Sequence, residues 1–429
     1  MQQRPQKREF QRLLAAEGIS NFGAMLSRLA IPWLAALVLQ ASPWQMAMLL
    51  VADVVAAAAG ALLLGAWVER HGKRQVMLWC DGARALVLLA LAGLAWRGEA
   101  TMPLLAGAAA ANGVLTMAFE VARSAWMAQR PESGELVRRN AQMSVATSLS
   151  ETAAFALGGW LFQWLGAVVA LLVDALSYVA SAVCLRGVPD VCTAVRPKDT
   201  AKDGAQNGAQ NAAHGAEGAR VMRIAAAGRA WRQELAEGLV AVAAHPTLRA
   251  LAVIEGLLAV AGSLAGTSYM IYVARDLAIP TGPLGVIFAL GGLGAIIGAR
   301  LAERTAHRFG VGRAMTVGLV AVALGAACIP LATGAGPLAI GLLVMHQLVG
   351  DGGHTVFAVH DRTLRQTEVQ PQMLARADSG IRGLGQCATL VGALLGGVVG
   401  SALGARGVLW LCAGVLLLAA AYAAARLRR

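Results

Sequence analysis

Apolar runs of about 20 residues follow one another along the chain and are separated by short polar links. A helix of this length crosses the hydrocarbon core of a bilayer. Within the runs the apolar positions recur at helical spacing, and the alternating pattern of a membrane β-barrel does not occur. The pattern predicts twelve spanning helices, over residues 14–39, 44–67, 75–96, 103–127, 141–164, 167–186, 248–273, 283–303, 313–333, 337–360, 380–403 and 407–426.

The composition supports a membrane location. The chain is 57% hydrophobic and 14% charged, whereas a soluble protein has about a quarter charged residues. Its net charge of +12 would also suit a nucleic-acid-binding protein. The excess, however, is mostly Arg that flanks the apolar runs, where basic residues set the orientation of spanning helices. We therefore expect a lipid bilayer, and no nucleic acid, as the partner.

The basic residues also predict which ends of the helices face the cytoplasm. Of the links after odd-numbered helices, the only basic residues are Arg97, Arg275 and Arg406. Because cytoplasmic links carry the excess of Lys and Arg, both chain termini should be cytoplasmic. The basic N-terminus is not followed by a small-residue cleavage site, so the first apolar run is interpreted as a span and not as a signal peptide. These features predict a multi-pass protein of the inner (cytoplasmic) membrane.

One long polar interruption divides the chain into two sets of six predicted helices, residues 1–190 and 248–429. The linker between them covers 191–247. Its part 196–220 is polar and repetitive, which predicts disorder. Its part 230–244 is amphipathic and is expected to lie as a helix along the inner membrane surface.

The two halves repeat each other. The segment ALGGWLFQWLG (156–166) returns as LLGGVVGSALG (394–404), an offset of 238 residues. At the same offset Phe119-x-Val121 falls on Phe357-x-Val359, which tests the alignment outside the motif. The matched glycines and the matched topology indicate an internal duplication.

The link between the second and third predicted helices carries glycines and charges at regular spacing. A glycine permits close helix contact or a tight turn, a carboxylate can cap a helix N-terminus, and basic side chains bind headgroups or partner carboxylates. From the charges alone, an ordinary cytoplasmic loop remains an equal alternative. The residues are Gly65, Glu69, Arg70, Gly72, Lys73 and Arg74.

This spacing resembles the G-x-x-x-D-R-x-G-R-R/K loop of the major facilitator superfamily, with Glu69 where the family usually has Asp. A degenerate second copy, Gly298-Ala-Arg-Leu-Ala-Glu303-Arg304, follows the eighth predicted helix. Three further segments resemble the branch that contains the enterobactin exporter and the macrolide-efflux permeases. They are Trp79-Cys-Asp81-Gly-Ala-Arg84-Ala85, Asp174-Ala-Leu-Ser-Tyr178 and Thr363-Leu-Arg365-Gln366.

The resemblance implies an all-α fold of two pseudo-symmetric six-helix bundles that rock about a central cavity. The first, fourth, seventh and tenth helices would line that cavity, and Glu69 would form part of a cytoplasmic latch. The sequence also departs from the family. The antiporter pattern G-P-x-x-G-G of the fifth helix is reduced to its last two glycines, Gly158 and Gly159, and the arginine motif of the fourth helix has no counterpart in 107–113. Proton coupling must therefore rest on other residues.

Ionisable residues inside spans are costly and usually have a role. Asp81 and Arg84 are three residues apart on one helix face, and we interpret them as a structural ion pair. The remaining charged candidates for proton coupling or substrate binding outside the tenth helix are Arg28, Asp53, Glu151 and Glu255. Arg28 needs either a carboxylate partner, for which Asp53 lies at a suitable depth, or an anionic substrate. Glu151 is either a proton-coupling group or a neutral carboxyl that hydrogen-bonds a backbone carbonyl.

The predicted helix over 337–360 is unusually polar, with His346, Gln347, Asp351 and His354. Positions 347, 351 and 354 share one face, and imidazoles titrate in the physiological pH range. The group could couple protons, hydrogen-bond the substrate, or make structural contacts. A metal site is the weakest alternative because no other helix offers a matching Cys or His. We predict no metal and no cofactor.

These observations predict a monomeric secondary exporter of an amphipathic small molecule, such as a drug or a siderophore-like metabolite, that exchanges it for protons by alternating access. An importer or uniporter of a polar metabolite is the alternative within the same class. An integral-membrane enzyme would need a nucleophile–base or metal set at membrane depth, and a sensor would need a folded module in the linker. No Walker A motif occurs, so the chain is not itself an ATP-driven pump.

Overall fold

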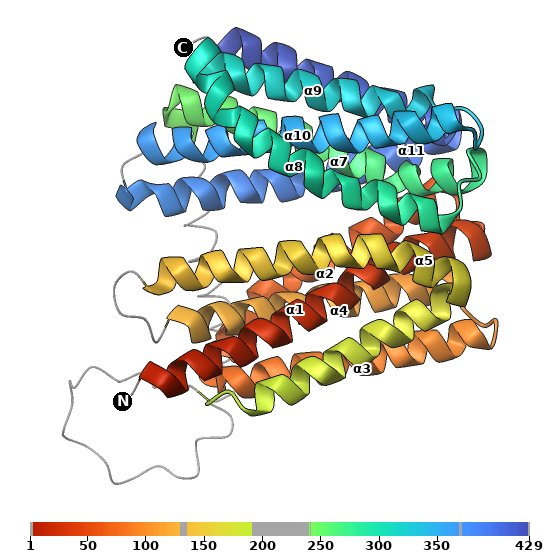
Figure 1. Ribbon diagram of the computed structural model, residues 1–429, viewed down its shortest axis with the longest axis vertical. Coiled ribbons are helices and arrows are strands. Elements are labelled where there is room, and N and C mark those ends of the chain that lie inside the picture. The colour runs from red at the N-terminus through yellow and green to blue at the C-terminus, as the bar shows by residue number, and fades with distance from the viewer. Residues whose placement is uncertain (1–2, 129–134, 191–239, 241, 369–370, 428–429) are drawn as a thin grey trace, which may run out of the picture.

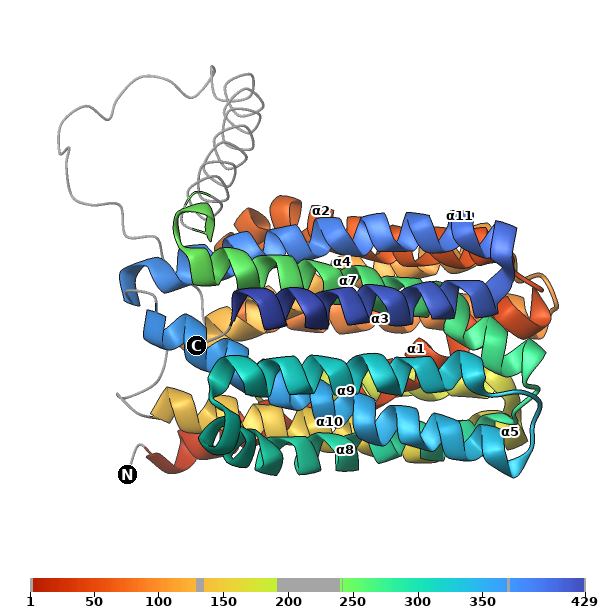
Figure 2. The same ribbon diagram turned by 90° about the horizontal axis from the view of Figure 1, so that it is seen from above.

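The computed structural model describes residues 3–128, 135–190, 240, 242–368 and 371–427. Every secondary-structure element within these ranges is a helix. Figures 1 and 2 show the helices as a bundle of nearly parallel rods with the N- and C-terminal ends on the same side. We call the described residues up to 190 the N-half and those from 242 onwards the C-half.

The helices of the two halves follow the predicted spans closely. Those of the N-half are α1 (Gln3–Trp33), the π-helical turn η1 (Leu34–Val38), α2 (Pro43–Arg70), α3 (Lys73–Trp96), α4 (Met102–Ala128) and α5 (Glu135–Arg186). Those of the C-half are α7 (Pro246–Ile271), the π-helical turn η2 (Tyr272–Asp276), α8 (Thr281–Phe309), α9 (Val311–Leu331), α10 (Pro337–Glu368) and α11 (Pro371–Arg426).

The number of membrane crossings follows from these helices. Nine described segments are long and apolar enough to span a membrane. Two of them, in α5 and α11, each hold two helices joined at a glycine with positive φ, Gly166 (81°) and Gly404 (70°). Helix α10, with 32 residues, is also long enough to span a membrane, but its polar residues lower its hydropathy. With these three additions the described chain makes twelve crossings, which confirms the predicted fold class. The linker 191–247 lies almost wholly outside the described residues.

The internal repeat extends to backbone geometry. The π-helical turns η1 and η2 begin at Leu34 and Tyr272, which are 238 positions apart. The two non-glycine residues with positive φ, Gln40 and Ala278, obey the same offset. The two helix-joining glycines, 166 and 404, obey it as well. Each half therefore carries a π-helical turn, a positive-φ residue after it and a helix-joining glycine at equivalent positions.

The halves contact each other through helix pairs that obey the same symmetry. In the α5–α8 pair, a Cβ added at Gly159 would lie 2.8 Å from the Cα of Gly285. In the α2–α11 pair, a Cβ added at Gly397 would lie 2.9 Å from the Cβ of Ala47. Position 397 is the repeat counterpart of position 159, and position 285 is that of position 47, because the members of each pair are 238 residues apart. The glycine motif that revealed the repeat thus forms both bundle crossings, where only a small residue permits such close approach.

The two halves are packed together at the end that carries η1 and η2. There one hydrophobic cluster joins both halves and includes Trp33, Leu49, Tyr272 and Leu284. In addition, Arg275 Nε of η2 donates a hydrogen bond of 2.8 Å to the carbonyl oxygen of Ala36 in η1. At the end with the chain termini the corresponding clusters are separate, one in each half. Among the described residues, the halves are therefore packed together at one end only.

Candidate substrate cavity and polar network

A cavity of about 590 Å³ lies mainly within the N-half. Cavities that bind drug-sized molecules have about 300–1,000 Å³. Its walls come from α1, α2, α4 and the second part of α5, and α7 contributes Gly266. Most of the lining is apolar, including Ile31, Met46, Leu49, Leu50 and Met117. The cavity therefore offers an apolar body and a small number of polar contacts.

Arg28 of α1 and Asp53 of α2 both line this cavity and are exposed to it. They are close enough to interact electrostatically. Within the described part of the chain, however, neither side chain takes part in a hydrogen bond or in an ion pair within 4.0 Å. The structure thus brings Arg28 and its expected partner into one cavity without pairing them.

Asp53 has a counterpart in the other half. Its Oδ1 would lie 2.8 Å from a Cβ added at Gly113 of α4, so the glycine makes room for the carboxylate. In the C-half, Asp351 of α10 packs in the same way against Gly291 of α8. Positions 53 and 291, and positions 113 and 351, are each 238 apart. In the N-half the carboxylate is on α2 and the glycine on α4, whereas in the C-half the glycine is on α8 and the carboxylate on α10. Each half therefore keeps one carboxylate where its two equivalent helices cross.

The polar residues of α10 point in different directions. Asp351 lies within electrostatic range of His354 and of Glu151, which comes from α5 of the N-half. Gln347 is buried and lies beside Asp351 against Gly291. His346 instead faces α7, with its ring 6.2 Å from that of Tyr269. The structure therefore groups Glu151, Asp351 and His354 across the two halves and places His346 apart from them.

Tyr269 is a residue that the sequence analysis missed. Its hydroxyl is buried without a hydrogen-bond partner among the described residues, and so is Nδ1 of His346. Tyr269 also lies within electrostatic range of Asp351. No motif marks this tyrosine, because its place beside the polar face of α10 depends on how α7 and α10 pack.

Glu255 belongs to a charged cluster near the terminal end of the C-half. Arg365 of α10 binds three carboxylates, those of Glu255 (3.2 Å), Asp361 (2.9 Å) and Asp378 (3.3 Å). A second cavity, of about 400 Å³, is lined by Arg365, Glu255, Asp378 and His354. The family resemblance implies one central cavity lined by the first, fourth, seventh and tenth helices. In the structure α10 lines the second cavity instead, and α2 takes its place in the larger one.

Asp81 and Arg84 lie together inside the N-half. Arg84 Nη2 is 3.6 Å from Asp81 Oδ1, and both side chains are almost completely buried. The guanidinium also lies 4.7 Å from the ring centres of both Phe119 and Tyr178. Ser181 donates a hydrogen bond of 2.7 Å to Asp81. This network links α3, α4 and α5 and does not reach the α10 group.

The link between α2 and α3 is held to the end of α5. A Cβ at Gly72 would collide with the carboxylate of Asp190, and that carboxylate accepts a hydrogen bond of 3.1 Å from the backbone N–H of Arg74. Lys73 is buried, and its Nζ donates to the carbonyl of Val68 at 2.7 Å. Lys73 therefore stabilises the end of α2 and does not face the lipid headgroups. The structure does not describe the side chains of Glu69 and Arg70 or the surroundings of Gly65.

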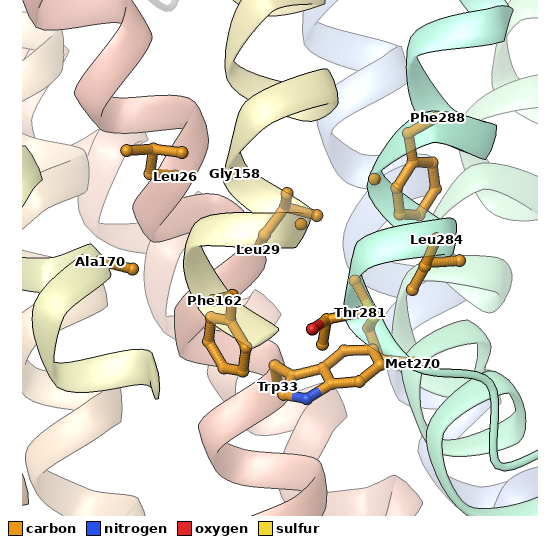
Figure 3. A pocket seen from close by; sticks show the side chains of 12 residues that line it. Leu26, Leu29, Trp33, Gly158, Phe162, Ala170, Met270, Thr281, Leu284 and Phe288 are labelled. Carbon is orange, nitrogen blue, oxygen red and sulfur yellow. The ribbon is translucent and has the colours of Figure 1, made fainter. Parts of the chain in front are cut away.

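A third, very small pocket of about 20 Å³ lies beside the Gly159–Gly285 crossing. Figure 3 shows Trp33, Phe162 and Phe288 around it, and none of its lining residues is ionisable. It is too small for a substrate. We interpret it as a packing gap at the contact between the halves.

Comparison with protein families and with solved structures identifies the superfamily and the fold of the chain. A family model described as Major Facilitator Superfamily matches residues 13–361. The solved structure of the nucleoside transporter NupG has 14% identity and a TM-score of 0.70, and the match covers 98% of this chain and 99% of that one. A bacterial homologue of the iron transporter ferroportin, in an inward-facing state, has 18% identity and a TM-score of 0.68 over 98% and 99% of the two chains.

A bacterial homologue of the human lysosomal transporter Spinster, inward-facing and unoccupied, has 14% identity and a TM-score of 0.69 over 98% and 97% of the two chains. Identities this low establish a shared fold and nothing about the substrate. Among curated proteins, no relative of this sequence is found.

Proposed function

Because the chain belongs to the major facilitator superfamily, we propose that it is a secondary active exporter of an amphipathic small molecule, driven by proton exchange. The fold is that of a transporter and not of an enzyme. The export direction, the amphipathic cargo and the proton coupling are our proposals, as is the placement within the branch of the enterobactin exporter and the macrolide-efflux permeases.

The observation that carries the proposal is the 590 Å³ cavity in a molecule whose halves are packed together at one end. Its apolar walls and few polar groups suit a molecule with an apolar body and a polar end. Alternating access requires the packed end to open while the other end closes. The two symmetric crossings, each built on small residues, allow such rocking without separating the halves.

The group formed by Glu151, Asp351 and His354 supports proton coupling. Glu151 belongs to the N-half, and the other two belong to the C-half. Glu151 and Asp351 lie within electrostatic range of each other and belong to opposite halves. Two such carboxylates repel when both are charged, so binding of one proton favours their approach. A change of one pKa unit between the two conformations shifts their balance about tenfold. Proton binding at this junction would thus bias the direction in which the cavity opens.

The proposed orientation of the chain in the membrane agrees with export. With both termini in the cytoplasm of an inner-membrane protein, the packed end faces outward and the cavity is reached from the cytoplasm. An exporter loads its substrate in this state. We propose that a single chain is the functional unit, because each chain contains both halves and its own cavity.

The proposal is tested by expressing the protein in a bacterial strain that lacks its main drug exporters. We expect a raised inhibitory concentration for at least one amphipathic compound in a panel of drugs and siderophores, and energy-dependent efflux of that compound. The matched control is Gly159→Val, which blocks the α5–α8 crossing. Uptake of a polar metabolite, with no compound exported, would show that the protein is an importer or a uniporter instead.

A further inference from the structure

The charges in the 590 Å³ cavity limit the chemistry of its ligand. Arg28 and Asp53 carry opposite charges, line the same cavity, and are not paired with each other. In the present conformation both are exposed, so water can solvate them. During transport the cavity must close over its substrate, and unpaired charges sealed at membrane depth are costly. A ligand that neutralised both charges would remove this cost.

The repeat shows that the cation is specific to one half. Adding 238 to 28 gives Gly266, which lines the same cavity from α7 and has no side chain to place there. The N-half therefore supplies the arginine, and the C-half leaves space opposite it. Asp53 in turn packs against Gly113. One anion, one cation and an open space beside them form an asymmetric polar site in a mostly apolar cavity.

The remaining acidic groups of the cavity have other surroundings. Glu120 lies within electrostatic range of Glu17, whose carboxylate pairs with Arg123. Glu17 precedes Arg28 by eleven residues on α1, which is about 16 Å along the helix axis. Asp174 is fully buried and packs against Gly23 beside Ser177. Arg28 and Asp53 are thus the charged pair that a bound headgroup would meet.

We propose that this cavity binds the headgroup of a zwitterionic amphipathic molecule, with an anionic group on Arg28 and a cationic group on Asp53. Asn112, whose buried Oδ1 has no hydrogen-bond partner within the described residues, adds an acceptor for the cationic group. A singly charged ligand satisfies one of the two residues and leaves the other uncompensated. The inference rests on the proposed transport function and specifies the substrate class for the same cavity.

The test measures binding to the purified full-length protein, so it does not depend on transport. Four probes share one phenylalkyl body: homophenylalanine (zwitterion), phenylbutylamine (cation), phenylbutyrate (anion) and phenylbutanol (neutral). We expect homophenylalanine to bind at least about tenfold more tightly than each of the other three, since each of them lacks at least one of its two charge-assisted contacts. Calorimetric titration gives the dissociation constants directly.

Two reciprocal variants assign the groups. Arg28→Gln should reduce the affinity for homophenylalanine to that for phenylbutylamine, and Asp53→Asn should reduce it to that for phenylbutyrate. Glu120→Gln removes a carboxylate from the same cavity and should leave the order of the four probes unchanged. Melting curves establish that each variant is folded.

Several results would overturn the inference. They are equal binding of phenylbutylamine and homophenylalanine to the parent protein, no binding of homophenylalanine, or an unchanged order of affinities in a folded Arg28→Gln protein. A protein that binds the zwitterion but exports nothing would refute the proposed exporter and leave the headgroup assignment intact. A protein that exports only neutral or singly charged compounds would refute the headgroup assignment and leave the proposed exporter intact.

Discussion

Replacing Arg275 by Gln should open the packed end of the molecule. Arg275 donates from Nε, at 2.8 Å, and from Nη2 to the carbonyl oxygen of Ala36. It joins the two π-helical turns by hydrogen bonds across the halves, and the symmetric position in η1 is Leu37, which cannot donate them. A hydrogen bond from a charged donor contributes about 1.5–3 kcal/mol. Because Arg275 is only partly buried, we take the lower value, about 1.5 kcal/mol, which corresponds to a roughly tenfold shift toward the state that is open at this end.

Double electron–electron resonance measures this shift. Spin labels at positions 99 and 336, in a protein whose native cysteines are replaced, lie on exposed links of the two halves at the packed end. We expect Arg275→Gln to increase the long-distance population about tenfold over the parent. Arg406→Gln is the matched control, because Arg406 donates to Pro330 within the C-half at 2.8 Å. If Arg275→Gln leaves the distance distribution unchanged, or if Arg406→Gln changes it equally, the contact does not hold the halves together.

Three further predictions address other parts of the molecule. Glu69→Gln should slow substrate turnover strongly while the protein still folds and inserts, since a charge at a helix terminus contributes only about 0.3–1 kcal/mol to stability; full transport activity would exclude a latch role. Arg84→Met should destabilise the folded protein by about 3–5 kcal/mol, because it leaves Asp81 buried without its cation, and melting curves in detergent would show this; an unchanged melting temperature would contradict it. Reporter fusions at Gly208 and Arg429 should report a cytoplasmic location, and a periplasmic signal from either would overturn the topology.

The sequence predicted the helices well because crossing a bilayer imposes a length and a hydropathy that are local properties. The boundary between the fifth and sixth predicted spans lies at residues 165–166, and the structure joins the two helices at Gly166. The repeat was also visible, and one glycine of each copy, Gly159 and Gly397, proved to lie at a contact between the halves. It was readable because close helix packing restricts the residue type at each crossing.

The site was less predictable because it depends on how helices are rotated and packed. The sequence made His346 a candidate together with Asp351 because both lie in one polar helix, but the structure turns His346 toward Tyr269 on another helix. Glu255 was a candidate coupling group, whereas it is bound to Arg365 from α10. The exchange of Asp and Gly between positions 53 and 113 and their symmetric counterparts also has no sequence signature. Only the three-dimensional contact shows that each half keeps its carboxylate at the same crossing.

Proton-driven transport in reconstituted vesicles tests the central claim most directly. Purified protein is inserted into liposomes with an imposed pH gradient, and the flux of an exported compound and the luminal pH are recorded together. The account predicts uphill substrate movement in step with proton counterflow, and loss of that coupling in Asp351→Asn while the substrate still binds. Uphill transport by Asp351→Asn equal to that of the parent, or substrate flux without proton movement in the parent, would contradict it.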